Sequence, residues 1–195
     1  MLERPPTEAE LVAVVKQAAA GGRRVRVGRS AEAGDVAIDL ALYDRLVRVD
    51  REAGSATVEA GISLRALSIA LGSWGLSLEN GGGHPAQSLG AAISIGAHGS
   101  GARYGGLATQ VTALRLVAPD GSVIACSATN EPEVFDAARV GLGALGVIST
   151  ITLRCQPGFN LRVVTETMSL DRALAEFDMV ADAHDHVELE WAAGR

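Results

Sequence analysis

Asn80-Gly-Gly-Gly-His-Pro-Ala-Gln-Ser-Leu-Gly-Ala-Ala-Ile-Ser-Ile-Gly-Ala-His-Gly-Ser-Gly-Ala-Arg-Tyr-Gly-Gly106 is the most informative stretch of this 195-residue sequence. Between Asn80 and Ala102 the only acidic or basic side chains are those of two histidines, and seven positions are glycine. Such a run offers a ligand mainly its own backbone, because glycine permits close approach and positive φ. Successive N–H groups in tight turns form a concavity that suits phosphate. We therefore expect an anion site made of backbone in residues 80–106, called the glycine run below.

Two common nucleotide sites do not fit this glycine run. The phosphate loop of ATPases and kinases needs a lysine and a hydroxyl residue after its last glycine, and no lysine lies near the run. The dinucleotide fingerprint needs G-x-G-x-x-G between a strand and a helix. Gly141-Leu-Gly-Ala-Leu-Gly146 has that spacing, but it follows a predicted helix and precedes a predicted strand. We reject both patterns.

The sequence before the run alternates helical and extended patterns. Thr7 and Glu10 have the spacing of a capping box, which predicts a helix over residues 8–20 that ends at Gly21-Gly22. Alternating or β-branched residues predict strands at 24–27, 36–40, 46–49 and 56–59. Ser63 is the expected cap of a helix that ends before Gly72. This half reads as one βαβ-like unit joined to short antiparallel strands.

The sequence after the run predicts a hairpin and then further alternation. Two apolar strands, 111–117 and 123–126, flank the turn Pro119-Asp-Gly-Ser122. Asn130-Glu-Pro-Glu133 is read as a second capping box that opens a helix to about residue 140. Further strands are predicted at 147–154, 161–166 and 187–191, with a helix over 169–183. The fold class is therefore α+β.

Composition excludes several classes of function. The net charge is −6, the pI is near 5.2 and no large basic cluster is present, so a nucleic-acid partner is not expected. The N-terminal residues do not resemble a signal peptide and the glycine run is too polar for a membrane span, so we predict a cytoplasmic protein without a membrane span. Cys126 and Cys155 lie in apolar strand patterns, which favours core thiols over a disulfide, and no metal site is predicted.

Several motifs in order resemble one family. Residues 87–101, the segment 108–117, the turn Pro119-Asp-Gly121 and the segment 135–148 are similar to the FAD domain of sugar-1,4-lactone and alditol oxidases. These enzymes belong to the vanillyl-alcohol oxidase superfamily, whose flavin domain is also called PCMH-type. The resemblance extends from about Thr7 to Leu161. It implies a two-subdomain PCMH-type FAD-binding domain over residues 1–160, divided near residue 80, and a partial substrate or cap domain over 161–195.

The resemblance also implies where FAD binds. In this family the loop after the first strand and the glycine run hold the pyrophosphate and flank the isoalloxazine ring, and a third segment contacts the cofactor through its main chain. Carried over to this sequence, the expected cofactor-binding residues are Gly28, Arg29, Ser30, Ser88, Gly90, Ala91, Ser94, Gly96, Ala97, His98, Gly99, Ser100, Gly101, Gly146, Val147 and Ile148. No catalytic residue is assigned.

The first loop departs from the family pattern. Relatives with covalent flavin carry a histidine in a Gly-Ser-Gly-His-Ser-like stretch, whereas this chain reads Gly28-Arg-Ser-Ala-Glu-Ala-Gly34 and is shorter. We therefore expect non-covalent FAD. Arg29 either pairs with a phosphate, for which a guanidinium is well suited, or is a solvated loop cation.

Several side chains keep two interpretations. His98 either contacts the flavin or fixes its own loop, and Ser88, Ser94 and Ser100 either donate to the ligand or cap local structure. His184 and His186 lack a third metal ligand and are read as a solvated cluster at a helix end. A Cβ at Gly99 is expected to meet the ligand or to be strained by a left-handed backbone.

Two functions compete. The first is the FAD-binding domain of an oxidoreductase that transfers a hydride from a carbinol of a sugar lactone or polyol to the flavin. The second is a non-catalytic remnant, or one piece of a split flavoenzyme, with weak or no FAD binding. MurB-type and molybdenum-hydroxylase flavin domains share the fold but match Ala97-His-Gly-Ser-Gly101 less well. Turnover is not expected from this chain alone, and exposed apolar surface on 169–191 would favour a homo-oligomer or a completing chain.

Overall fold

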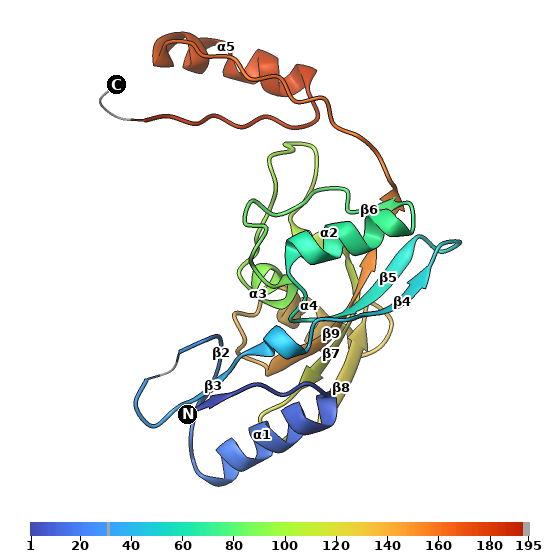
Figure 1. Cartoon of the computed structure of the whole chain (residues 1–195), viewed down its shortest axis with the longest axis vertical. Helices are drawn as coiled ribbons and strands as arrows, with labels where there is room; N and C mark the ends of the chain where they lie inside the picture. The colour runs from blue at the N-terminus through green and yellow to red at the C-terminus, as the bar shows by residue number, and fades with distance from the viewer. Residues whose placement is uncertain (31, 193–195) are drawn as a thin grey trace.

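The structure is a computed structural model that describes residues 1–30 and 32–192 (Figure 1). Residue 31 of the first loop and residues 193–195 of the expected cap segment lie outside the described residues. Helices and mostly antiparallel strands build the molecule, so the predicted α+β class is confirmed. The division into domains at residues 80 and 160 stays a prediction.

The first helix begins and ends where its sequence signals lie. Helix α1 spans Glu8–Ala20, and the Thr7 side chain accepts a hydrogen bond from the N–H of Glu10. Gly22, with φ of 63°, follows the end of the helix. Leu11 and Val15 lie on its buried face, so the apolar stripe docks the helix on the core.

A small parallel sheet is formed by one strand before α1 and two strands after it. Its order is β1 (Leu2–Glu3), β3 (Val36–Ile38) and β2 (Val25–Val27), with Val25 opposite Val36. All three residues of β3 are buried, as expected for a central strand. The strand predicted at 36–40 ends at Ile38, because Asp39 caps a short 3₁₀ helix, η1 (Leu40–Leu42), through the N–H of Ala41.

The larger sheet is antiparallel and joins strands from both sides of the glycine run. Its order is β4 (Leu46–Asp50), β5 (Ser55–Glu59), β9 (Val147–Arg154), β7 (Val111–Val117) and β8 (Val123–Ser127). The predicted hairpin is present as β7 and β8. Strand β5 pairs with β9 along its length. The glycine run therefore leaves and returns to one rigid sheet.

Short elements surround this sheet. They are α2 (Leu64–Ser73), β6 (Leu76–Ser77), α3 (Leu89–Ser94), the 3₁₀ helix η2 (Leu107–Gln110), α4 (Pro132–Arg139) and β10 (Gln156–Pro157), which pairs with β6. The α2 side chains of Leu67 and Leu71 are fully buried. Helix α2 continues through Gly72 to Ser73, so its predicted end before Gly72 was two residues too early.

The capping box predicted at Asn130 was wrong. Glu131 is the N-cap of α4, with a left-handed φ of 49° and no side-chain cap bond. Asn130 instead belongs to a turn after β8, where its backbone pairs with Ser127 and its side chain donates to the carbonyl of Ala125. The proline at the first helical position starts α4 without that cap.

The C-terminal part is one helix between extended segments. Helix α5 spans Leu170–Ala183, and the Ser169 side chain accepts from the N–H of Arg172. The strands predicted at 161–166 and 187–191 were wrong, since neither segment pairs with another strand in the described part of the chain. Alternating side chains make a strand only where a partner backbone lies alongside. In Figure 1 this part lies apart from the sheet, at the end of the molecule near α2.

The core lies between the large sheet and the helices. Its members include Leu89, Leu107, Ile151 and Leu153, each 0% exposed. Cys126 and Cys155 are buried free thiols, as predicted, and burial raises the pKa of both. Within residues 1–30 and 32–192, none of the helices has the length and apolar character that a membrane crossing requires.

Candidate functional site

The glycine run begins with a tightly packed helix. Ser88 is the N-cap of α3, and its hydroxyl makes no cap bond there. Gly90 lies against Ala60, because a Cβ at Gly90 would be 3.0 Å from the Ala60 Cβ. The N–H of Gly90 donates to the carbonyl of Ala60 at 2.9 Å. Gly90 therefore serves packing, while the neighbouring Ala91 is half-buried.

The end of α3 turns the chain toward the open part of the run. Ser94 donates its hydroxyl to the carbonyl of Gly90 at 2.8 Å, so this hydroxyl is used within the helix. Gly96 has φ of 70°, and the N–H of Ala97 donates back to Ala92 at 2.8 Å. A left-handed glycine that ends a helix in this way is a standard stop. The following residues leave the helix as a loop.

Six successive backbone N–H groups in this loop have no partner within the described protein. They belong to residues 98–103, and none of them donates a hydrogen bond to the described residues. The loop is closed after them, since Tyr104 donates to Gly101 at 3.1 Å and Leu107 donates to Ala97 at 2.9 Å. We call these six groups the amide row. Unpaired backbone donors require water or an acceptor ligand, so the row suits an anion or a group rich in carbonyl oxygens.

The glycines of the amide row are required by contacts with the protein. A Cβ at Gly99 would be 2.0 Å from the Asn80 Oδ1 and 2.3 Å from the Gly81 carbonyl. A Cβ at Gly101 would be 2.3 Å from the Tyr104 ring. The reason expected for Gly99 from the sequence was therefore wrong, because its φ is not left-handed and the obstruction is the chain itself.

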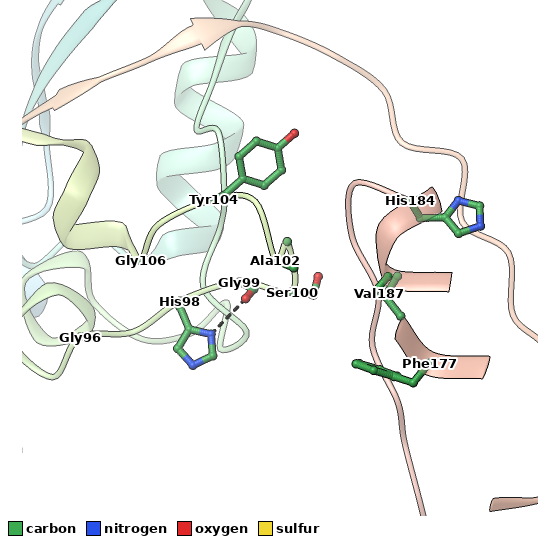
Figure 2. Close-up of a pocket in the computed structure, with 12 residues that line it drawn as sticks. Gly96, His98, Gly99, Ser100, Ala102, Tyr104, Gly106, Phe177, His184 and Val187 are labelled. Carbon is green, nitrogen blue, oxygen red and sulfur yellow. Dashed lines mark hydrogen bonds between the residues drawn. The ribbon is translucent and has the colours of Figure 1, made fainter. Parts of the chain in front are cut away.

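A cavity of about 520 Å³ lies in front of the amide row. Figure 2 shows Gly99 and Ser100 on one side and Phe177 and Val187 on the other. One wall is therefore backbone N–H and glycine, while the opposite wall from α5 and the segment after it is largely apolar. No Asp, Glu, Lys or Arg belongs to the described residues that line it.

Three contacts hold the C-terminal segment against the run. The N–H of Val187 donates to the carbonyl of Ser100 at 3.2 Å. Arg103 donates to the carbonyl of Asp182 at 2.5 Å, and α5 has no basic residue of its own in its last turn. The rings of Tyr104 and His186 stack with centroids 5.3 Å apart. His186 thus has an aromatic partner, which its sequence context did not indicate.

His98 is turned onto its own loop. Its Nδ1–H donates to the carbonyl of Gly99 at 3.0 Å, as Figure 2 shows. The imidazole is exposed at the rim of the cavity. Of its two interpretations, the structure supports a side chain that fixes the loop.

The first predicted loop is not joined to the glycine run. Gly28, with φ of 149°, donates its N–H to Ile38 at 2.8 Å, and a Cβ there would meet no atom within 4 Å. The Arg29 side chain is 85% exposed, with its Nε 4.0 Å from the Asp39 Oδ2, and Ser30 is exposed. In the described chain, no hydrogen bond connects residues 28–30 with residues 88–101.

The third predicted segment is joined to the run. The N–H of Leu142 donates to the carbonyl of Ser94 at 3.2 Å, which brings the loop before β9 beside the end of α3. Gly146, with φ of 142°, packs on β7, since a Cβ would be 2.3 Å from the Val117 carbonyl. Val147 and Ile148 are buried in β9. Any contact of these residues with a ligand would be through the backbone.

Two buried polar residues beneath the amide row were missed from the sequence. Asn80 is 2% exposed and donates from its Nδ2 to the carbonyl of Gly105 at 3.3 Å. Gln110 is 1% exposed, accepts from the N–H of Glu79 at 2.9 Å and donates to the carbonyl of Asn80 at 2.9 Å. The available signal in the sequence was the amide side chain of Gln110, directly before the apolar strand 111–117.

Comparisons with known proteins point to the same region. A family profile described as FAD binding domain matches residues 1–127. L-gulono-1,4-lactone dehydrogenase of Mycobacterium tuberculosis is 41% identical over 192 residues, which cover 95% of this chain and 44% of that protein. L-gulonolactone oxidase of Bos taurus is 36% identical over 98% of this chain and 45% of its own length. Mitochondrial L-galactono-1,4-lactone dehydrogenase of Brassica oleracea is 34% identical over 95% of this chain and 32% of its own length. The chain spans less than half the length of these relatives.

Proposed function

Because the chain belongs to the FAD-binding-domain family, whose profile covers residues 1–127, we propose that it is the cofactor-binding part of an oxidoreductase that acts on a sugar lactone or a polyol. FAD is its cofactor. When bound, FAD supplies the redox chemistry by accepting a hydride from a carbinol carbon. The protein's own share is to bind, orient and shield that group.

The observation that carries this proposal is the amide row. Six N–H groups at residues 98–103 have no partner among the described residues, five of these six residues line a cavity of about 520 Å³, and no acidic side chain belongs to its described lining. Acceptor oxygens of the pyrophosphate or of the flavin ring would satisfy these donors. The residues present therefore fit FAD, and the row includes His98, Gly99, Ser100 and Gly101 among the predicted cofactor-binding residues.

The first loop, residues 28–34, holds FAD in this proposal without a covalent bond. Residues 28–34 contain no histidine, so FAD is held non-covalently. The Arg29 side chain is 85% exposed, with its Nε 4.0 Å from the Asp39 Oδ2, so it is available to pair with a phosphate. Its role would be that of a cation in the first loop that pairs with a phosphate of FAD, in keeping with the preference of guanidinium for phosphate.

A second candidate is an FAD-binding protein without turnover. It is favoured by the cavity lining, because the described lining residues include no carboxylate or lysine that could take up the carbinol proton, and of the two histidines among them His98 already bonds the carbonyl of Gly99. A completing chain or a second copy would then supply that group. This partner, like the cytoplasmic location, stays a prediction.

Two assays separate these candidates. Protein reconstituted with FAD is mixed anaerobically with L-gulono-1,4-lactone or with xylitol, and the visible flavin band is followed. Bleaching of the band supports hydride transfer by this chain. An unchanged band, with FAD still bound after desalting, supports binding without turnover, and we expect this result for the chain alone. Protein that binds no FAD contradicts both candidates.

A further inference from the structure

The amide row has little support of its own. Its six N–H groups make no hydrogen bond to the described protein, and the polar atoms of residues 98–103 make only four hydrogen bonds within the described residues: His98 with its neighbour, the carbonyl of Gly101 with Tyr104, the carbonyl of Ser100 with Val187, and Arg103 with Asp182. Two of these lead to the C-terminal segment rather than to the core. The depth and angle of the row must therefore be set by what lies beneath it.

The Asn80 carboxamide lies directly beneath the row. The Asn80 Oδ1 occupies the place that a Gly99 side chain would need, at 2.0 Å from an ideal Cβ. Its Nδ2 donates to the carbonyl of Gly105, where the chain turns back toward η2. One buried side chain thus contacts both the middle of the row and the segment that closes the loop after it.

Gln110 fixes Asn80 in turn. Its carboxamide bonds the backbone on both sides of the Glu79–Asn80 peptide unit, accepting from the N–H of Glu79 and donating to the carbonyl of Asn80, each at 2.9 Å. Gln110 is the last residue of η2 and directly precedes β7, the strand between β8 and β9 in the large sheet. The rigid sheet is thereby connected to the floor of the amide row through two side chains.

We propose that Asn80 and Gln110 are positioning residues that set the geometry of the amide row for the FAD group it holds. Neither residue lines the cavity; Asn80 acts through its packing on Gly99 and its bond to Gly105, and Gln110 acts through the backbone of Glu79 and Asn80. The inference rests on the proposed function, in which residues 98–103 bind FAD. Removal of the Gln110 carboxamide leaves the buried carbonyl of Asn80 unpaired, and removal of the Asn80 carboxamide removes the bond to Gly105 and the support beneath Gly99. Either change lets the row move, and ligand sites lose affinity when their supporting contacts loosen.

The test uses Gln110→Met, which keeps the side-chain length and removes both hydrogen bonds. We expect its dissociation constant for FAD, measured on folded protein by flavin fluorescence, to rise about tenfold. Val15→Ala in α1 is the control, because it lowers stability in the core away from the row. It should leave the dissociation constant unchanged. Equal FAD affinity in Gln110→Met and the unmodified protein would overturn the proposal, as would an equal loss in the control.

A second readout does not depend on FAD. Amide hydrogen exchange of Tyr104 and Leu107, whose N–H groups close the loop, is measured on the apoprotein. Exchange should be faster in Gln110→Met and unchanged in Val15→Ala. If the unmodified protein binds no FAD, the proposed function fails while this exchange still tests the connection. Unchanged exchange in Gln110→Met overturns the connection itself. If Gln110→Met does not fold, Asn80→Ser is tested in the same two assays with the same expected results.

Discussion

Gly99 rests on the carboxamide of Asn80, so closely that a Cβ at Gly99 would lie 2.0 Å from the Asn80 Oδ1. The contact joins the middle of the amide row to a side chain that is 2% exposed. The contact explains why residue 99 is glycine, because a side chain there would clash with atoms of the protein itself. The first prediction follows from this contact.

Gly99→Ala should weaken both folding and FAD binding. The added methyl displaces Asn80 or the Gly81 carbonyl, and overpacking of this kind costs about 2 kcal/mol. Urea denaturation measures the stability and fluorescence titration measures the FAD affinity. Gly83→Ala is the matched control, since a Cβ there meets nothing within 4 Å and its φ is not left-handed. Equal behaviour of the two variants would contradict the packing described for Gly99.

Tyr104→Ala should release the C-terminal segment without unfolding the core. The stacked pair of Tyr104 and His186 contributes about 1 kcal/mol. Loss of the pair should speed hydrogen exchange in α5 while β7 and β9 stay protected. His186→Ala should have the same effect, and the double variant should be no worse than either single one. His84→Ala, in the same run but outside the contact, is the control. Additive effects of the two single changes would show that the rings are not coupled.

Glu8→Gln should lower stability at neutral pH and much less in acid. The hydrogen bonds from Arg115 lower the pKa of Glu8, burial opposes this, and the Ser149 hydroxyl and the charge of Arg115 add to it. A lowered folded-state pKa gives stability that is present above the ordinary value of about 4.3 and lost as the pH falls through the lower value. We expect a loss of about 1 kcal/mol at pH 7.

Urea denaturation of Glu8→Gln and the unmodified protein at several pH values checks this dependence. The two free energies of unfolding should converge below about pH 4. Glu133→Gln, at an exposed carboxylate, should match the unmodified protein throughout. A difference for Glu8→Gln that stays constant into acid would mean that the charge of Glu8 is not what stabilises α1 on the sheet.

Arg29→Gln should weaken FAD binding several-fold at low salt and less at high salt. An exposed guanidinium that reaches a phosphate acts mainly through charge, which salt screens. Arg51→Gln, also an exposed arginine, is the control, because it lies in the turn between β4 and β5. The dissociation constant at two ionic strengths is the measurement. Equal affinity in Arg29→Gln and the control would leave Arg29 as a solvated loop cation.

Local signals in the sequence predicted much of the fold. The bounds of α1 and β9 follow from capping residues and from a continuous apolar run, which act over a few neighbours. The hairpin of β7 and β8 follows from its turn. The strands expected at 161–166 and 187–191 failed because a strand depends on a partner backbone that the local pattern does not contain.

The site was predicted in part. The sequence predicts that residues 98–101 bind through their backbone, since little else is present there, and their N–H groups have no partner among the described residues. It did not indicate Asn80 and Gln110, because their importance arises from bonds across about 30 positions of the chain. By resemblance it also places Gly28 at the same cofactor as the run; no hydrogen bond among the described residues connects the two segments, and their shared contact with FAD stays a prediction. Contacts between distant segments are the information that one sequence lacks.

The retention of FAD by the purified chain tests the central claim most directly. The protein is incubated with FAD, desalted, and its visible absorbance is recorded before and after acid precipitation. We predict a structured flavin band that stays with the protein through desalting and is released completely into the supernatant by acid. Colourless protein after desalting, with no signal in an FAD titration, would contradict the claim that the amide row at residues 98–103 binds FAD.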